Sequence, residues 1–129
     1  MLIVKEIMNP NVYSLASNTI LRKVARVMRD KKVGCIIVKK NGEFVGVVTE
    51  VDIVRKGIAE NLDMDLTKME DIMSAPLITI DSNKTVTDAN EIMDKNGTRH
   101  LAVKEGREII GIISARDLIH PPYLDGEGW

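Results

Sequence analysis

The chain contains one seven-residue pattern twice, as Gly46-Val47-Val48-Thr49-Glu50-Val51-Asp52 and as Gly111-Ile112-Ile113-Ser114-Ala115-Arg116-Asp117. Each copy has a glycine, two β-branched residues, a hydroxyl residue and, three positions after it, an aspartate. The two copies are offset by 65 residues. A fixed internal offset predicts an architecture that is built from two copies of one unit.

The same offset extends well beyond the pattern, because Ile7 to Val54 matches Ile72 to Ile119 without a gap. Within it Val38-Lys39 returns as Val103-Lys104. We therefore expect a duplication. The expected boundaries are repeat 1 at residues 1–65, with a core at about 5–58 and a connector at 59–68, repeat 2 at residues 66–120, and a C-terminal tail at 121–129.

Each copy reads as strand, helix, strand, strand, helix. The expected opening strands are Val12 to Ala16 and Leu77 to Ile80, and the helices, apolar at three-and-four spacing, are Thr19 to Lys32 and Thr85 to Asn96. The expected strand pairs are 35–38 with 44–48 and 101–103 with 109–113, followed by a last helix from Thr49 or Ser114. Asn41-Gly42 is a hairpin signal, Thr85 with Asp88 predicts a capping box, and Gly97 predicts a helix end.

The fold class predicted from this order is α+β, with mixed sheets and β-α-β-β-α repeats. A single unit of about 55 residues is marginal as an independent fold, because a small domain buries too little of its surface. We therefore expect the two repeats to pack sheet to sheet, related by a pseudo-two-fold axis.

Composition excludes several classes for this chain of 129 residues. Cys35 is the single cysteine, so no internal disulfide framework is possible, and we interpret it as a small buried hydrophobe. No apolar run approaches the roughly 20 residues of a membrane helix, and the N-terminal stretch is unlike a signal peptide. We expect a soluble, cytoplasmic protein without a membrane role.

A basic cluster in the first predicted helix admits two interpretations, a nucleic-acid surface or the solvated face of an amphipathic helix. The cluster consists of Arg22, Lys23, Arg26, Arg29, Lys31 and Lys32. No aromatic residues are interleaved to stack bases, and the helix has an apolar face that consists of Leu21, Val24, Ala25, Val27 and Met28. We favour the solvated face and expect no nucleic-acid binding.

The repeated pattern also admits two interpretations. A hydroxyl residue with an acidic residue three positions later is a helix-start device that satisfies free backbone N–H groups. The same geometry suits a nucleotide, because a helix start presents N–H donors to phosphate and a carboxylate can accept two hydrogen bonds from a ribose diol.

With both copies in register, the chain resembles a tandem pair of CBS domains, a Bateman module named after cystathionine β-synthase. The residues that carry the resemblance are the two G-h-h-[TS]-x-x-D patterns, the stretch 98–103, and the entries Ile7-Met8-Asn9-Pro10 and Ile72-Met73-Ser74-Ala75-Pro76. The resemblance covers about Lys5 to His120 and implies a disc-shaped module with two clefts for adenosine-containing ligands: AMP, ADP, ATP or S-adenosylmethionine.

In one implied cleft Asp117 binds the ribose hydroxyls, Ser114 binds the phosphate region and Arg99 reaches the phosphate. The other residues implied there are Ile112 and Arg116 as lining, with Met8 and Tyr13 around the adenine.

In the second implied cleft Asp52, Thr49 and Val47 take the corresponding places. The opposite wall implied by the resemblance consists of Met73, Ile78 and Thr98.

The two clefts are not expected to be equal, because Gly34 stands where the second copy has Arg99. A charge-assisted contact to phosphate is stronger than a neutral hydrogen bond. We therefore predict tighter nucleotide binding at Asp117, and an Asp52 cleft that is weak, empty or suited to a less anionic ligand.

The predicted function is a regulatory ligand-sensing module that signals to a protein partner, and the resemblance implies a homodimer. The alternative is a ligand-free structural or dimerisation module in which both patterns are only caps. No catalytic residues are predicted, since no nucleophile is paired with a base, and no cofactor is required. His100 and His120 lack partners at metal-ligand spacing, so no metal site is expected.

Overall fold

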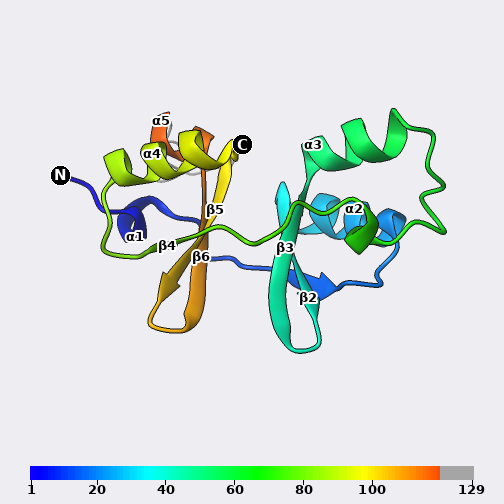
Figure 1. Ribbon diagram of the computed structural model, residues 1–129, viewed down its shortest axis with the longest axis horizontal. Coiled ribbons are helices and arrows are strands. Elements are labelled where there is room, and N and C mark those ends of the chain that lie inside the picture. The colour runs from blue at the N-terminus through cyan, green and yellow to red at the C-terminus, as the bar shows by residue number, and fades with distance from the viewer. Residues whose placement is uncertain (120–129) are drawn as a thin grey trace. The chain divides into compact units, whose positions relative to one another are not determined.

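The computed structural model describes residues 1–119, which divide into two compact units. We call residues 13–77 the first-copy unit, and residues 1–12 together with residues 78–119 the second-copy unit. Figure 1 shows that each unit has its own sheet and its own helices. The α+β class with mixed sheets is confirmed.

The first-copy unit contains a three-stranded sheet in the order β1-β2-β3, with β1 parallel to β2 and β2 antiparallel to β3. Its elements are β1 (Ser14–Ala16), α2 (Leu21–Lys31), β2 (Cys35–Lys40), β3 (Glu43–Thr49), α3 (Glu50–Asp52), the π-helical segment η1 (Ile53–Ile58) and the 3-10 turn η2 (Met69–Asp71).

The second-copy unit repeats this sheet in the order β4-β5-β6, again with one parallel and one antiparallel pair. Its elements are α1 (Val4–Ile7), β4 (Thr79–Asp81), α4 (Val86–Asn96), β5 (His100–Glu105), β6 (Glu108–Ser114) and α5 (Ala115–Ile119). Both sheets therefore have the strand order that the duplication predicts.

Local signals in the sequence place the turns and caps. Asn41 and Gly42 both have positive φ, 52° and 78°, which suits the tight turn between β2 and β3. Thr85 and Asp88 exchange hydrogen bonds of 3.0 and 3.1 Å at the start of α4, and Gly97 ends that helix with φ 61°. The predicted hairpin, capping box and helix end are confirmed.

The predicted strands differ from the observed ones at their ends. The central strands are longer than expected and continue to the hairpin turns, because the register allows pairing up to Lys40 with Glu43 and up to Glu105 with Glu108. The opening strands are shorter, with three residues each, because β1 and β4 each pair with one neighbour over three positions only.

Each unit has its own apolar core between the sheet and its helices. In the first-copy unit α2 buries Leu21 and Val24 against Ile36 and Val48 of the central strands. In the second-copy unit α4 buries Ala89 and Met93 against buried residues of β4, β5 and β6. The residues predicted to form the apolar helix face therefore do so.

The segment that precedes each opening strand belongs to the unit formed by the other repeat. Residues 1–12 lie in the second-copy unit, where Val4 and Ile7 are buried in the core. Met69 and Ile72 are buried in the core of the first-copy unit. We call the stretch before the opening strand of each repeat its lead-in segment. Each lead-in segment packs in the unit that is formed mainly by the other repeat, so the compact units and the repeats of the sequence have different boundaries.

Candidate functional site

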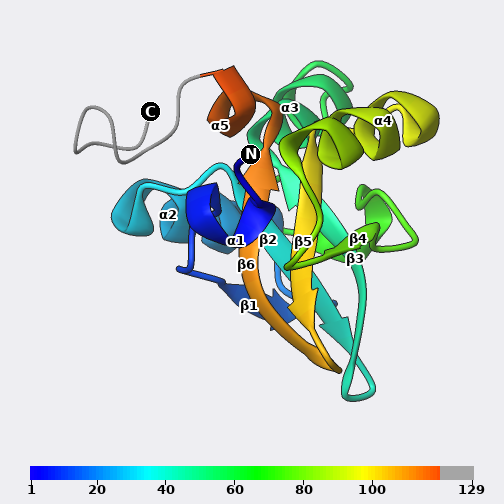
Figure 2. The same ribbon diagram turned by 90° about the vertical axis from the view of Figure 1, so that its left-hand side faces the viewer.

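The repeated pattern lies at the junction of the last strand and the last helix of each unit. In the second-copy unit, α4 and α5 lie at the same end of β5 and β6, opposite the hairpin turn (Figure 2). Ser114 ends β6 and Ala115 begins α5. The pattern therefore places its hydroxyl and carboxylate at the carboxyl end of a strand, where ligands of sheet-and-helix proteins commonly bind.

Ser114 and Asp117 hold each other in a reciprocal cap. The Ser114 backbone N–H donates to Asp117 Oδ2 at 2.8 Å, and the Asp117 N–H donates to Ser114 Oγ at 3.3 Å. Both residues are partly exposed. Within residues 1–119, no cation lies at ion-pairing distance from the Asp117 carboxylate. One face of this carboxylate is thus engaged by the backbone.

Thr49 and Asp52 form the same cap in the first-copy unit, but in a more buried setting. The Thr49 N–H donates to Asp52 Oδ2 at 3.0 Å, and the Asp52 N–H donates to Thr49 Oγ1 at 3.2 Å. Asp52 is only 8% exposed. A carboxylate at this depth requires partners for its charge.

The cap by itself does not distinguish a binding site from a helix start. Thr85 and Asp88 make the same pair of hydrogen bonds at the start of α4, and these bonds hold the pKa of the Asp88 carboxyl below its ordinary value. The difference between the three caps must therefore come from the groups around them.

The lead-in segments lie against the glycines that open the two patterns. A Cβ on Gly46 would stand 2.5 Å from the backbone oxygen of Ser74 and 3.2 Å from Met73 Sδ. A Cβ on Gly111 would collide with Met8 Sδ and would lie 3.0 Å from the backbone oxygen of Asn9. The close approach explains both glycines and places Met73 and Met8 beside the patterns, each within one unit.

The residue whose carbonyl accepts the first N–H of the last helix is Arg99 in the second-copy unit and Gly34 in the first-copy unit, so its charge differs between the units. The Ala115 N–H donates to the Arg99 carbonyl at 2.8 Å, and Arg99 is exposed. In the first-copy unit the Glu50 N–H donates to the Gly34 carbonyl at 3.0 Å, and Glu50 Oε1 lies 2.5 Å from the place of a Cβ on Gly34. A carboxylate therefore lies over the position that carries an arginine in the second copy.

Lys56, four residues after the end of the first-copy pattern, contacts Asp52 and was not predicted from the sequence. Its ammonium lies 3.1 Å from Asp52 Oδ1 and donates to the Ile72 carbonyl at 3.2 Å and to Ser74 Oγ at 3.3 Å. The spacing of Asp52 and Lys56 could have predicted this ion pair, since residues four apart on a helix are neighbours. The comparison of the two copies did not reveal it, because the position equivalent to Lys56 holds Pro121.

The other predicted site residues are distributed over the two units. Val47 and Ile112 lie within the strands and pair with the lead-in residues Ser74 and Asn9. The remaining three are Tyr13, which packs on the core of the first-copy unit, and Ile78 and Thr98, which belong to the second-copy unit.

Cys35 and His100 occupy equivalent positions, each paired across the hairpin with the hydroxyl residue of its pattern. Cys35 is buried, and burial together with the charge of Asp52 raises the pKa of its thiol to about 12. The thiol is therefore a poor nucleophile at neutral pH. Residues 1–119 bring no three His, Cys, Asp or Glu side chains together in an arrangement suited to a metal ion.

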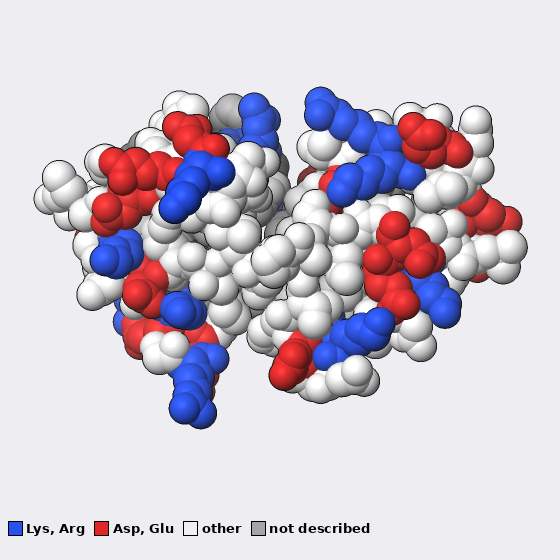
Figure 3. Space-filling model, in the orientation of Figure 1, with Lys and Arg blue, Asp and Glu red and all other residues white. Residues whose placement is uncertain are grey.

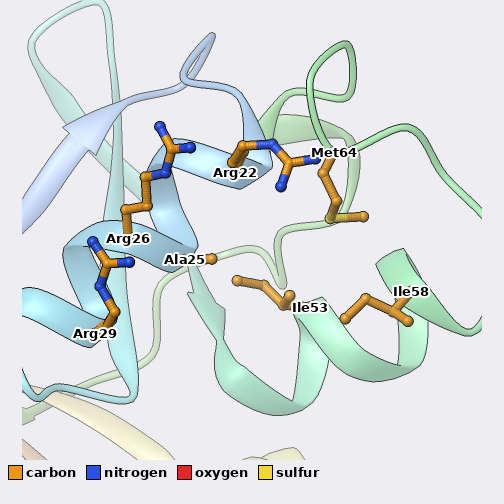
Figure 4. Close-up of a pocket in the computed structure, with 7 residues that line it drawn as sticks. All are labelled: Arg22, Ala25, Arg26, Arg29, Ile53, Ile58 and Met64. Carbon is orange, nitrogen blue, oxygen red and sulfur yellow. The ribbon is translucent and has the colours of Figure 1, made fainter.

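A groove of about 430 Å³ lies in the first-copy unit and is lined mainly by α2 and by η1, the segment that follows Asp52. Figure 4 shows Arg22, Arg26 and Arg29 along one side, from α2, with Ile53 and Ile58 on the other side. Acidic neighbours lie close to this basic edge: Arg22 pairs with Asp65, and Arg29 with Asp30.

Charge on the visible surface is mixed. Figure 3 shows Lys and Arg side chains interspersed with Asp and Glu on each unit. The helices formed by residues 1–119 include none with the length and apolar character that crossing a bilayer requires.

Comparisons with known proteins agree with this architecture. A family model described as CBS domain matches residues 4–58 and 69–121. An uncharacterised protein of Methanocaldococcus jannaschii is 38% identical over 99 residues, which cover 74% of this chain and 53% of the relative. The chain spans 31% and 54% of two further archaeal relatives, so it covers about half or less of these proteins.

Two solved structures have the same fold. The crystal structure of an uncharacterised conserved protein from Pyrococcus horikoshii has a TM-score of 0.81 and 28% identity, covering 91% of this chain and 89% of that one. A protein of Burkholderia ambifaria, named for signal transduction and for its CBS domains, has a TM-score of 0.79 and 25% identity, with coverages of 94% and 88%.

Proposed function

Because the chain belongs to the CBS-domain family and carries two of these domains in tandem, we propose that it senses an adenosine-containing ligand and signals occupancy to a protein partner. The ligand class is AMP, ADP, ATP or S-adenosylmethionine, which is typical of such pairs. One relative of the same fold is named for signal transduction, which supports a regulatory role. The ligand would act by binding one of two arrangements better than the other.

The observation that carries the proposal is the setting of Asp117. Its carboxylate is held by the Ser114 N–H, is partly exposed, and has no cationic partner within residues 1–119. Carboxylates of this kind accept hydrogen bonds from a ribose diol in other nucleotide sites. Asp117 is therefore proposed to bind the ribose, with Ser114 beside the phosphate.

The charges around the two patterns support different ligand preferences. The second copy has two arginines, Arg99 and Arg116, with one aspartate, whereas the first copy has Glu50 and Asp52 with one lysine. Arginine binds phosphate strongly because its N–H groups form charge-assisted hydrogen bonds. Nucleotide is therefore proposed to bind more tightly at the Asp117 pattern.

The further residues of the proposal are carried from the family by position. For the Asp117 pattern they are Ile112, Met8 and Tyr13, and for the Asp52 pattern they are Thr49, Val47, Met73, Ile78 and Thr98.

A thermal-shift screen tests the proposal, with AMP, ADP, ATP and S-adenosylmethionine as the probes. A ligand at 100 times its dissociation constant stabilises the folded chain by about 2.7 kcal/mol. We expect at least one probe to raise the Tm of the wild-type chain, and Asp117→Asn to reduce that rise. No shift with any of the four probes would contradict ligand sensing.

A dimerisation module is the second candidate, and one surface feature favours it. Val51, Val54 and Ile58 are 47%, 56% and 59% exposed along α3 and η1. Apolar residues at this spacing on one helical face are typical of a surface that packs against a partner. We propose a homodimer through this face, and expect Val54→Glu to convert it to monomer in light-scattering measurements of mass.

A further inference from the structure

We infer that Lys56 is a latch on the Asp52 pattern, and that it makes this pattern unresponsive to ribose while the Asp117 pattern stays responsive. The inference rests on the proposed function, because it concerns the regulation of one of the two proposed ligand sites. It assigns a role to a lysine that the comparison of the two copies does not predict.

The Lys56 ammonium has three polar neighbours. It donates hydrogen bonds to the Ile72 carbonyl at 3.2 Å and to Ser74 Oγ at 3.3 Å, and it forms an ion pair with Asp52 Oδ1 at 3.1 Å. The Lys56 side chain is 47% exposed, whereas that of Asp52 is only 10% exposed.

The latch occupies the carboxylate from the side that its cap leaves open. Asp52 Oδ2 accepts the Thr49 N–H at 3.0 Å, and Oδ1 forms the ion pair with the Lys56 ammonium at 3.1 Å. A ribose diol that binds the carboxylate through both hydroxyls must compete with that ammonium. The ammonium places a full positive charge beside the carboxylate, and a neutral sugar hydroxyl does not supply that charge, so it is a poorer partner for Asp52.

The latch also ties the last helix to the lead-in segment of the same unit. Ile72 is buried in the core, and Ser74 exchanges two backbone hydrogen bonds with Val47. Lys56 therefore connects Asp52 to a segment that is itself anchored at both places. The two hydrogen bonds to this segment thus hold the ammonium beside Asp52, where a ligand has to compete with it.

The second copy cannot form the same latch. The position equivalent to Lys56 holds Pro121, whose side chain carries no ammonium and which lies outside the described residues. The equivalent carboxylate, Asp117, has no cation at ion-pairing distance within residues 1–119. The expected difference in ligand affinity between the two patterns therefore depends on Lys56 as well as on Arg99.

Calorimetry with adenosine tests the latch in an Asp117→Ala background, which leaves Asp52 as the proposed site. Adenosine carries no phosphate, so a direct contact between Lys56 and the ligand's charge does not arise. We expect Lys56→Met to tighten adenosine binding by about tenfold, because the ammonium no longer competes with the ribose for the Asp52 carboxylate. The further substitution Asp52→Ala abolishes this gain.

Two variants control for charge and for folding. Arg55→Met removes the same charge from the neighbouring position, which forms no ion pair with Asp52 in the part of the chain that the structure describes, and leaves the affinity unchanged. Lys56→Arg keeps a cation beside Asp52 and retains the weak binding. Thermal unfolding of each variant verifies that it is folded.

The outcomes separate the latch from the proposed function. If the wild-type chain binds AMP but Lys56→Met binds adenosine no more tightly than its parent, the latch is wrong and the ligand-sensing function stands. If Arg55→Met gives the same gain as Lys56→Met, the effect is one of net charge and the latch is again wrong. If no variant binds any adenosine compound, both fail.

Discussion

Val47 and Ser74 exchange two backbone hydrogen bonds, of 3.0 and 2.9 Å, although Ser74 belongs to the second repeat and Val47 to the first. Asn9 and Ile112 make the reciprocal pair, with bonds of 2.8 and 2.9 Å. Each lead-in segment thus adds to the edge of a hairpin formed by the other repeat. This exchange brings the backbone of the lead-in against Gly46 and Gly111.

The close approach at Gly46 predicts that a methyl group there is not tolerated. We expect Gly46→Ala to lower the free energy of unfolding by about 2 kcal/mol, because its Cβ meets a backbone oxygen at 2.5 Å that is fixed by hydrogen bonds. Urea unfolding measures the change. Gly57→Ala is the control: its Cβ meets the flexible end of Met64, so it should be neutral or slightly stabilising. Equal effects of the two substitutions would contradict this explanation.

The cap at the start of α4 predicts a smaller and strictly local effect. Thr85→Ala removes the oxygen that accepts the Asp88 N–H, so we expect a loss of about 1 kcal/mol in the free energy of unfolding. Thr85→Ser retains the hydroxyl and should recover most of this loss. If this cap stabilises the helix and does not bind ligand, Thr85→Ala and wild type have the same ligand affinity.

The Cys35 thiol predicts slow chemistry in the folded chain. Burial and the charge of Asp52 raise its pKa to about 12, so about one molecule in ten thousand is a thiolate at pH 8. We expect alkylation by iodoacetamide to be far slower in the native chain than in urea. Because Cys35 is the single cysteine, mass spectrometry reads the rate directly. Equal native and denatured rates would show that the strand around Cys35 opens freely.

We expect the ion pair between Lys5 and Glu105 to account for part of the loss of folding stability at acidic pH. Lys5 lies 2.8 Å from the Glu105 carboxylate, and with the Ser82 hydroxyl it holds the pKa of Glu105 below its ordinary value of 4.5. A lowered carboxyl pKa stabilises the fold above about pH 4.5, and the contribution is lost as the pH falls through the lowered value.

Lys5→Met should therefore lower stability near neutral pH and flatten its decline on acidification. Urea midpoints between about pH 5 and about pH 3 measure the slope. Lys95→Met is the matched control, since Lys95 makes no ion pair within the described part of the chain. An unchanged slope in Lys5→Met would mean that this pair does not contribute.

The elements that depend on local signals could be predicted from the sequence. The Asn41-Gly42 turn, the Thr85 cap and the apolar face of α2 follow from residue types at fixed spacing. The exchange of lead-in segments could not be predicted in this way, because it depends on which edge of which hairpin is open to Ser74 and Asn9. Such pairing leaves no periodic pattern in the sequence.

The candidate site shows the same division. Comparison of the copies identified Thr49 with Asp52 and Ser114 with Asp117, since residues that differ little between copies stand out. It missed Lys56, because a residue that is present in only one copy appears as divergence. Only the structure reveals the ion pair, in which Lys56 Nζ lies 3.1 Å from Asp52 Oδ1.

Calorimetric titration of AMP into wild type, Asp117→Ala and Asp52→Ala tests the central claim most directly. We predict one tight binding event per wild-type chain, which Asp52→Ala retains and Asp117→Ala loses. An equal loss of affinity in both variants, or loss in Asp52→Ala with retention in Asp117→Ala, would contradict the assignment of the nucleotide to the Ser114 and Asp117 pattern.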